Sequence, residues 1–400
     1  MSELSYLEKL LDGVEVEWSN LGNLCDIFTG GEAPQKHIKG DTPTSDYQYP
    51  IYGNGAEIYG YADSYRIGQD AVTISSIGAN TGTIYFRKAF FTPIIRLKVV
   101  IPKHSWLLPR YLFHYLSSQT INSKSSSVPN MNASDVKKLS IPIPCPENPE
   151  KSLAIQSEIV RILDKFTALT AELTAELTMR KKQYNYYLDQ SLSFKEGEVE
   201  LKTLGEMGTL IRGKRFVKAD IIPKGVPCIH YGEMYTHYRI WADKAKSYIS
   251  VELASKLRKA SCGDVVFVSA GETIADIGRG TAWLGDEDVV IHDACFFYKS
   301  SLNPKYVAYF SRTNFFHDQI KKSISSGKIS AINAKGFEKV IIPVPSPEEQ
   351  ARIVAFLDKF DTLTSSITEG LPREIELRQK QYEYYRDLLF SFPRPETASN

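Results

Sequence analysis

The segment RKKQYNYYLDQSLSF (180–194) returns near the end of the chain as RQKQYEYYRDLLFSF (378–392). Further pairs follow in the same order: RILDKFTAL (161–169) with AFLDKFDTL (355–363), LSIPIPCP (139–146) with VIIPVPSP (340–347), PRYLFHYLS (109–117) with PKYVAYFSR (304–312), and Asn132-Ala133 with Asn333-Ala334. The members of each pair lie 194 to 201 residues apart, so the 400-residue chain is an internal duplication.

The duplication continues past the ends of the chain. VEVEWSNLG (14–22) resembles EVELKTLG (198–205), so the N-terminal piece copies the segment that follows the first long repeat. The chain therefore looks like a closed two-fold repeat that has been opened at one point. We expect its two ends to meet and its halves to show pseudo-two-fold symmetry, which suits a palindromic partner or a symmetric pair of partners.

The repeated segments predict long helices. After Pro149 there is neither glycine nor proline up to Phe194, and apolar residues recur every three or four positions, at Ile155, Ile159, Ile162, Phe166, Leu169, Leu173 and Leu177. About 42 residues at ~1.5 Å each make a helix of roughly 60 Å. In the second copy we expect a break at Gly370, with Pro372 starting the next helix.

Two apolar stripes in one chain most simply bury each other as an antiparallel coiled coil. The alternative is that each stripe packs on its own globular domain. The run LTAELTAEL (169–177), with Leu169, Leu173 and Leu177 on the stripe, repeats every four residues. Adding or removing one TAEL unit keeps the stripe roughly in phase and changes the helix by about 6 Å, which is under two base-pair steps. We therefore interpret 169–177 as an adjustable spacer.

The segments between the helices predict short strands and turns, because β-branched and aromatic residues alternate with frequent glycine and proline. Each ends in a helical patch, at 109–118 and at 304–323. We predict an α+β fold in which two such blocks are separated by two long antiparallel helices. The expected boundaries are an N-terminal segment 1–18, a first block 19–148, a helical spacer 149–200, a second block 201–346 and a C-terminal helical region 347–400.

Charge alternates along the chain although the formal net charge is only +1. Basic residues outnumber acidic ones by 5 in 30–143 and by 7 in 201–341, whereas 1–29, 144–200 and 342–400 carry net charges of −5, −3 and −3. Basic blocks suit a polyanion, and acidic connectors would be repelled by one.

Polar and basic residues cluster in the loops of both blocks. Arginine and lysine reach phosphates and guanine edges, and asparagine reaches adenine edges. The candidate DNA-binding residues are Lys36, His37, Asn54, Asn80, Arg87 and Lys88 in the first block, and Arg212, Lys214, Arg215, His230, Arg279 and Lys328 in the second. The blocks diverge from each other while the helices stay alike, which predicts an asymmetric, bipartite target with an unread gap.

These features together resemble the specificity subunit of Type I restriction-modification enzymes over the whole chain. IPVPSPEEQARIVAFLDKFDTL (342–363) is similar to that family's exit from a target-recognition domain into a conserved helix, and the TAEL spacer and RQKQYEYYRDLLFSF tail resemble its IC subgroup. The first exit departs from the pattern: it has CPENPEKSLAIQSEI (145–159) where the second has the compact SPEEQARIV (346–354), so the pair Glu349-Gln350 is not reproduced there.

The resemblance implies two target-recognition domains that bind a split double-stranded DNA target, one half each. It also implies two modification (methyltransferase) subunits as partners, joined by restriction subunits. Those partners would use S-adenosylmethionine, ATP and Mg²⁺, whereas this chain would be non-catalytic, hold no cofactor or metal, and act in the cytoplasm.

The sequence itself offers little for catalysis. It has no Pro-Pro for an amino-methyltransferase turn and no Pro-Asp for a nuclease strand, and GTLIRGKR (208–215) falls short of a phosphate-binding P-loop. The five cysteines, Cys25, Cys145, Cys228, Cys262 and Cys295, lack metal spacing, and no apolar run reaches membrane-spanning length. The open alternative is a two-headed adaptor that binds proteins and lacks DNA specificity.

Overall fold

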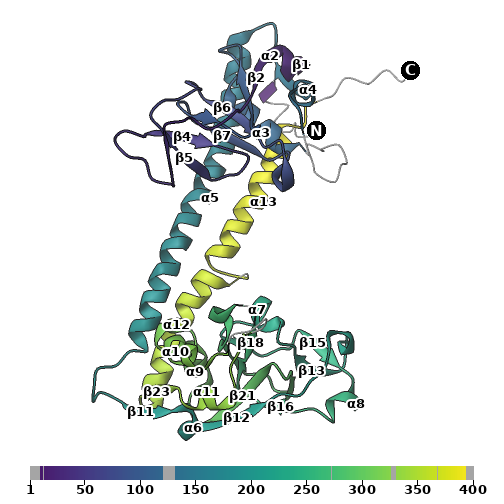
Figure 1. Cartoon of the computed structure of the whole chain (residues 1–400). Coiled ribbons are helices and arrows are strands. Elements are labelled where there is room, and N and C mark those ends of the chain that lie inside the picture. Colours follow the sequence, from purple (N-terminus) through teal and green to yellow (C-terminus); the bar gives the residue numbers. More distant parts are fainter. Residues whose placement is uncertain are drawn as a thin grey trace. The chain divides into compact units, whose positions relative to one another are not determined.

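The computed structural model describes residues 10–11, 13–119, 131–271, 273–325, 330–366 and 368–392. The chain divides into two compact units: Met1–Leu173 with Glu374–Asn400, and Thr174–Arg373 (Figure 1). Each unit combines one strand-rich block with helix from two distant parts of the sequence. We call them the first unit and the second unit.

The described residues of the first unit form three sheets, with strand orders β1-β10, β2-β9-β6-β7 and β3-β5-β4-β8. The strands are β1 (Val16–Asn20), β2 (Cys25–Thr29), β3 (His37–Lys39), β4 (Tyr49–Tyr52), β5 (Ile58–Ala62), β6 (Ala71–Ile74), β7 (Ile84–Arg87), β8 (Thr92–Pro93), β9 (Lys98–Pro102) and β10 (Ser140–Pro144). The short helical elements of the unit are α2 (Leu21–Leu24), η1 (Gly78–Asn80), α3 (Pro109–Ser118) and α4 (Ala133–Lys137).

The described residues of the second unit repeat this arrangement with additions. The sheets have the orders β11-β23, β12-β21-β17-β19-β14, β15-β13-β20-β16 and β18-β22. The strands are β11 (Glu200–Thr203), β12 (Gly208–Arg212), β13 (Val226–Ile229), β14 (Trp241–Ala242), β15 (Ser247–Ile249), β16 (Lys259–Ala260), β17 (Val265–Val268), β18 (Ala270–Gly271), β19 (Gly280–Trp283), β20 (Val289–Ile291), β21 (Cys295–Ser300), β22 (Ser330–Ala331) and β23 (Ile341–Val344). The short helices are α6 (Leu204–Met207), η2 (Lys218–Asp220), α7 (Glu233–Thr236), α8 (Val251–Ala254), η3 (Ile274–Asp276), α9 (Pro304–Phe310), α10 (Asn314–Ile320), η4 (Lys321–Ser323) and α11 (Ala334–Glu338).

The predicted duplication is confirmed element by element. β1 pairs antiparallel with β10 in the first unit, as β11 pairs with β23 in the second. The repeated Asn-Ala pairs begin equivalent short helices: Asn132 Oδ1 accepts a hydrogen bond from the N–H of Asp135 at 3.0 Å, and Asn333 Oδ1 accepts one from the N–H of Gly336 at 2.9 Å. Asparagine is favoured at this position because its side chain satisfies a free N–H of the first helical turn.

The long helices largely follow the sequence prediction. α5 runs without interruption over Pro149–Ser191, whereas the second copy is split into α12 (Pro347–Ser365) and α13 (Leu371–Leu389). Gly370, with φ of +81°, lies in the expected break, and a side chain there would meet the carbonyl oxygen of Thr362 at 2.5 Å. The helical patch predicted at 304–323 is instead α9 followed by α10, because the Thr313 hydroxyl caps a new helix by accepting from the N–H of Phe316.

The described ends of the chain meet, as expected. Leu11 and Leu21 from the N-terminal part share one apolar core with Leu389, Phe390 and Phe392. In Figure 1 the yellow α13 accordingly ends in the unit that holds the purple and blue strands.

The apolar stripe of α5 is buried to different degrees along its length. Ile155 and Ile159 are buried, but Leu169 is 37% exposed. Burial is greatest towards the helix ends because a strand-rich block packs on each of them.

Helix pairing occurs as well. α5 stacks Phe166 on Tyr385 of α13 in the first unit, at 5.2 Å between ring centroids. In the second unit Tyr187 of α5 contacts Phe356 of α12 at 5.7 Å, while Tyr184 lies beside Asp361. This reversed order means that α5 and α12 run antiparallel.

Candidate nucleic-acid interface

In each unit one short turn carries the chain from one sheet to the next. Residues 94–97 join β8 to β9, and residues 292–294 join β20 to β21. The two turns are equivalent, because β8 and β20 each run parallel to a neighbour, β4 or β13, and β9 and β21 each pair with two antiparallel strands. We call them the first tip (94–97) and the second tip (292–294).

A glycine packs against each tip. Gly30 donates its N–H to the carbonyl of Leu97 at 2.7 Å, and Gly213 donates to that of Cys295 at 3.0 Å. A β-carbon on Gly30 would lie 2.8 Å from the backbone nitrogen of Ile94, and one on Gly213 would lie 2.2 Å from the carbonyl oxygen of His292. Only glycine permits this close passage of two backbones.

The backbone of the first tip is strained. Ile95 and Arg96 have φ of 52° and 57°, a region that residues with a β-carbon rarely adopt and β-branched residues avoid most strongly. Four bonds hold this conformation: the N–H groups of both residues donate to Gly31 and Gly30, and both carbonyls accept from side chains, those of Asn54 and Ser76.

Two predicted residues of the first unit support this structure from within. Asn54 donates Nδ2 to the carbonyl of Ile95 at 2.9 Å and accepts from the N–H of Ser76 at 2.9 Å. Arg87 is 8% exposed, with its guanidinium 3.8 Å from the centre of the Tyr52 ring and bonded to the carbonyl of Gly55 at 3.2 Å. Burial lowers the pKa of Arg87. Both side chains therefore hold backbone segments in place.

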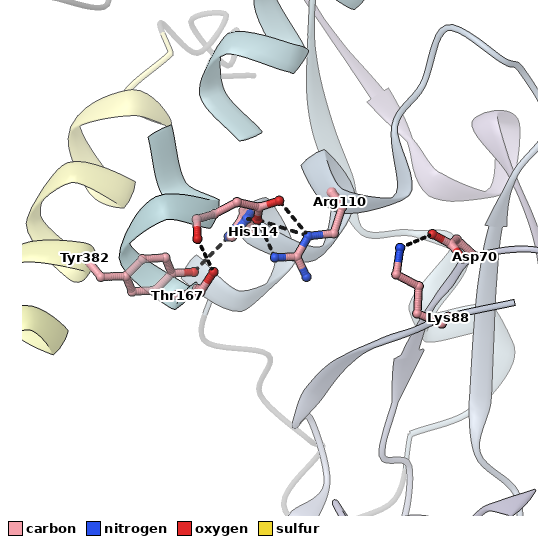
Figure 2. A network of polar contacts seen from close by, with 7 residues as sticks. Asp70, Lys88, Arg110, His114, Thr167 and Tyr382 are labelled. Atoms are coloured by element: carbon pink, nitrogen blue, oxygen red, sulfur yellow. Dashed lines mark hydrogen bonds and ion pairs between the residues drawn. The ribbon is translucent and has the colours of Figure 1, made fainter. Parts of the chain in front are cut away.

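The other predicted residues of the first unit are spread over its surface. Lys36 and Asn80 are exposed, and His37 bonds through Nδ1 to the carbonyl oxygen of Pro34 at 2.7 Å. Lys88 forms an exposed ion pair with Asp70 at 3.2 Å (Figure 2). An exposed ion pair of this kind contributes little to stability.

Four predicted residues of the second unit do come together, around the second tip. Arg212 donates Nε to the carbonyl of Asp293 at 2.8 Å, and the N–H of Lys214 donates to that of Ile291 at 3.0 Å. The His230 ring lies 4.6 Å from the His292 ring. The fourth, Arg215, is exposed in the same segment as Lys214 and contributes to the electrostatic field at His292.

The second tip forms an aromatic cluster that the sequence did not reveal. His292 lies 5.1 Å from the Tyr231 ring and 5.2 Å from that of Phe216. Burial lowers the pKa of both His230 and His292, and each is further affected by neighbouring charges. Tyr231, which is 37% exposed, and the partly exposed His230 can stack on and hydrogen-bond with nucleobases beside the exposed cations, whereas His292 is 8% exposed and packs beneath them.

The remaining candidates lie elsewhere. Arg279 pairs with Asp276 at 2.8 Å and lines a cavity of 420 Å³ together with Arg239 and Arg312. None of the residues that line this cavity belongs to the second tip. Lys328 falls outside the described residues.

A buried polar network fixes the first block on the helices. Figure 2 shows Arg110 and His114 of α3 converging with Tyr382 of α13. His114 bonds through Nε2 to Asp164 of α5 at 2.7 Å and through Nδ1 to the hydroxyl of Tyr382 at 3.0 Å, and Arg110 pairs with the same Asp164 carboxylate. Burial lowers the pKa of His114 despite the bond to Asp164.

The second unit repeats this anchor with different residues. Lys305 pairs with Asp358 at 2.8 Å, and the hydroxyl of Tyr309 donates to the same carboxylate at 2.7 Å. The carboxylate is thus retained in both units, whereas its partners change from Arg110 and His114 to lysine and tyrosine.

A pair of buried glutamines provides a further anchor. Gln350 accepts from the N–H of Asn303 at 2.9 Å and donates to the carbonyl of Pro345 at 2.9 Å. Gln156 accepts from the N–H of Leu108 at 3.0 Å and donates to the carbonyl of Trp106 at 3.0 Å. Gln156 therefore occupies the place of Gln350, and Ile155 stands where the second exit has Glu349. The Glu-Gln pair is not reproduced in the first exit, but its glutamine is present.

The described residues offer no other chemistry of note. Among them no group of three or more His, Cys, Asp or Glu side chains is arranged to hold a metal ion. Within the same residues, no helix combines the length and apolar character needed to cross a bilayer.

A duplicated scaffold that presents two unlike basic blocks defines a two-headed recognition protein. The chain belongs to the family described as Type I restriction modification DNA specificity domain, whose profile matches residues 13–179 and 196–377. It is 42% identical to the Escherichia coli Type I restriction enzyme EcoR124I/EcoR124II specificity subunit, with 100% of both chains covered. It is 34% identical to the E. coli EcoprrI specificity subunit, over 92% of this chain and 93% of that one.

Solved structures share the fold at low sequence identity. The S subunit of a Type I restriction-modification system from M. genitalium is 14% identical, with a TM-score of 0.56 over 96% of this chain and 98% of that one. A chain from a structure of an assembled type I R-M system is 15% identical, with a TM-score of 0.58 over 94% and 97%.

Proposed function

We propose that this chain is the DNA sequence-specificity subunit of a Type I restriction-modification complex and reads an asymmetric, bipartite DNA target, one half-site with each block. The observation that carries the proposal is that the two tips occupy the same place in the fold but present different chemistry. The first tip exposes Ile95 and Arg96, whereas the second has a buried His292 with the exposed Tyr231 and three exposed cations around it, Arg212, Lys214 and Arg215. Equivalent placement with unlike side chains gives two different reading heads.

The charge pattern supports DNA as the ligand. The blocks are basic and the helices acidic, so the DNA backbone would be drawn to the blocks and away from the connectors. The predicted contact residues that are exposed in the described structure remain candidates for phosphate or base contact: Lys36, Asn80, Lys88, Arg212, Lys214 and Arg215. The segments 19–148 and 201–346 then act as recognition domains, and the leucines of 169–177 belong to the spacer.

The chain is not itself an enzyme, so methylation and cleavage belong to partner subunits. We propose that two modification subunits dock on surfaces repeated by the duplication. Tyr186 of α5 and Tyr384 of α13 hold the same position in YNYYLDQ and YEYYRDL, and they are 61% and 65% exposed. Two exposed aromatic side chains in equivalent settings suit two copies of one partner.

Restriction subunits would then join the modification subunits in the cytoplasm. Those partners would supply the S-adenosylmethionine, ATP and Mg²⁺ chemistry. In native mass spectrometry, Tyr186→Ala or Tyr384→Ala should each reduce the bound methyltransferase subunits from two to one, and the double variant should bind none. Tyr65→Ala, at an exposed tyrosine of the first block, serves as the control and should still bind two. Full binding by the double variant would contradict the docking surface.

The DNA-reading proposal is tested by mapping methylated bases genome-wide in cells that express the complete system. We expect one sequence with two specified half-sites and a fixed gap of unspecified bases between them. Salt-dependent DNA binding by the assembled complex would separate this function from that of a protein-binding adaptor, which should show no such dependence. Methylation without a split recognition sequence would refute the proposal.

A further inference from the structure

We propose that the first tip inserts the side chains of Ile95 and Arg96 into a DNA groove, where they read bases of the first half-site. The inference rests on the function proposed above and adds two residues that no sequence pattern singles out. It starts from the positive φ of both residues, 52° and 57°.

Two successive strained residues need a reason to persist. Each costs on the order of 1–3 kcal/mol, and such strain survives where the surrounding structure fixes it. Glycine or asparagine would relieve it at no loss of packing, since Ile95 is 53% exposed and Arg96 is also exposed. The second tip shows that the turn does not require the strain, because none of residues 292–294 has a positive φ.

The surroundings hold the first tip rigidly. Asn54 and Ser76 each donate to a carbonyl of the tip, at 2.9 and 2.6 Å, and Gly30 and Gly31 accept from its two N–H groups, at 3.1 and 2.8 Å. All four bonds use backbone atoms of the tip. Both side chains are therefore left free to project while their origin stays fixed, which is the preorganisation that a reading element requires.

The chemistry of the pair fits a groove. The side chain of Arg96 makes no hydrogen bond or ion pair with any of the described residues, so its guanidinium is available for a ligand. Arginine forms the commonest specific contact with guanine through O6 and N7, and an apolar side chain beside it can contact a thymine methyl group. A second exposed cation lies close by, because a β-carbon on Gly31 would be 3.8 Å from Nη1 of Arg66.

The two chemical roles open to Arg96 predict different results. If Arg96 contacts a base, its removal should reduce the discrimination between bases at one or two positions of the target. If Arg96 contacts a phosphate, its removal should lower the affinity for all sequences equally and reduce the slope of log affinity against log salt concentration by about 1. We infer the base contact, because a strained, fixed backbone adds nothing to a phosphate contact that a flexible lysine can make.

The test uses the assembled complex and DNA in which each base pair of the target is replaced in turn. Arg96→Ala and Arg96→Lys should both lose roughly 10- to 100-fold discrimination at one or two positions of the first half-site, with the second half-site unchanged. Arg161→Ala, at an exposed arginine of α5 in the same unit, is the control and should leave discrimination intact.

Ile95→Gly distinguishes a loss of base discrimination from a loss of folding. It should raise the thermal unfolding temperature by relieving strain, while discrimination in the first half-site falls. Uniform loss of affinity over all sequences in the Arg96 variants, or unchanged discrimination, would overturn the inference. A wild-type complex with no base preference in either half-site would instead overturn the proposed function, and the inference with it.

Discussion

Replacing Gln350 by methionine should destabilise the second unit by about 1–5 kcal/mol. Gln350 is 4% exposed, and its amide bonds the N–H of Asn303 and the carbonyl of Pro345, both at 2.9 Å. Methionine fills a similar volume without hydrogen bonds, so these two backbone groups would be buried unsatisfied. Each such group costs ~1–3 kcal/mol, and the apolar side chain recovers about 1 kcal/mol.

Hydrogen–deuterium exchange of the full chain measures this locally and does not require both units to unfold together. A change of ~1.4 kcal/mol is tenfold in an equilibrium constant, so peptides covering 301–310 and 345–357 should exchange roughly 5- to 4000-fold faster. Gln379→Met, at an exposed glutamine of α13, should change these peptides by less than about twofold. Exchange in Gln350→Met as slow as in that control would show that the glutamine does not anchor the block.

Three further predictions concern the first anchor, the spacer and the second tip. Burial lowers the pKa of His114 below that of an unfolded histidine, so the unfolded chain binds protons first and stability should fall below about pH 6.5, by at most ~1.4 kcal/mol per pH unit for this group. His114→Tyr places at this position the residue type that the second unit has at Tyr309, and it can still bond to Asp164. This change should flatten the pH dependence of the urea unfolding midpoint, and an unchanged pH dependence would show that His114 does not cause it. Adding one TAEL unit to 169–177 should lengthen the preferred gap between half-sites by one or two base pairs in a methylation map, and an unaltered gap would show that α5 does not set it. Gly213→Ala places a β-carbon 2.2 Å from the carbonyl oxygen of His292, so the second tip must move, and base discrimination should fall in the second half-site alone; equal losses in both half-sites would argue against separate reading heads.

Local features of the chain were predicted from sequence because their causes are local. The break at Gly370 follows from the conformational freedom of glycine, and the helix starts at Asn132 and Asn333 follow from side-chain capping. The duplication needed only the repeated segments themselves. These inferences depend on a few neighbouring residues, so the remaining fold cannot reverse them.

The roles of polar residues were harder to predict because burial is decided by distant segments. Arginine is usually exposed at protein surfaces, but the guanidinium of Arg87 lies against the Tyr52 ring and bonds the loop that contains Gly55. The strain at Ile95 and Arg96 has no sequence signature, since neither residue is one that favours a positive φ.

Gln156 was missed for a different reason. The offset between the repeats falls from 201 residues at the Ile-Pro exits to 194 within the following helices. Counting from the exits therefore places residue 148 opposite Glu349, whereas counting from the LDKF motif places Gln156 opposite Gln350. The extra residues of the first exit lie before the helix contacts the block, where they leave the anchor unchanged.

The anchors explain how two unlike blocks can remain attached to one repeated scaffold. Gln156 and Gln350 bond the blocks through backbone N–H and carbonyl groups, which every sequence supplies. Two tyrosines of the short block helices likewise bond the backbone of the strand that leads from each block into its long helix: the hydroxyls of Tyr111 and Tyr306 donate to the carbonyls of Pro142 and Pro343, at 2.8 and 3.0 Å. Because these bonds are made to backbone atoms, they do not depend on the side chains of the block. The side chains of the tips can therefore differ without weakening the attachment of the block. Attachment through backbone atoms therefore allows the two tips to diverge while the helices that hold the blocks stay alike.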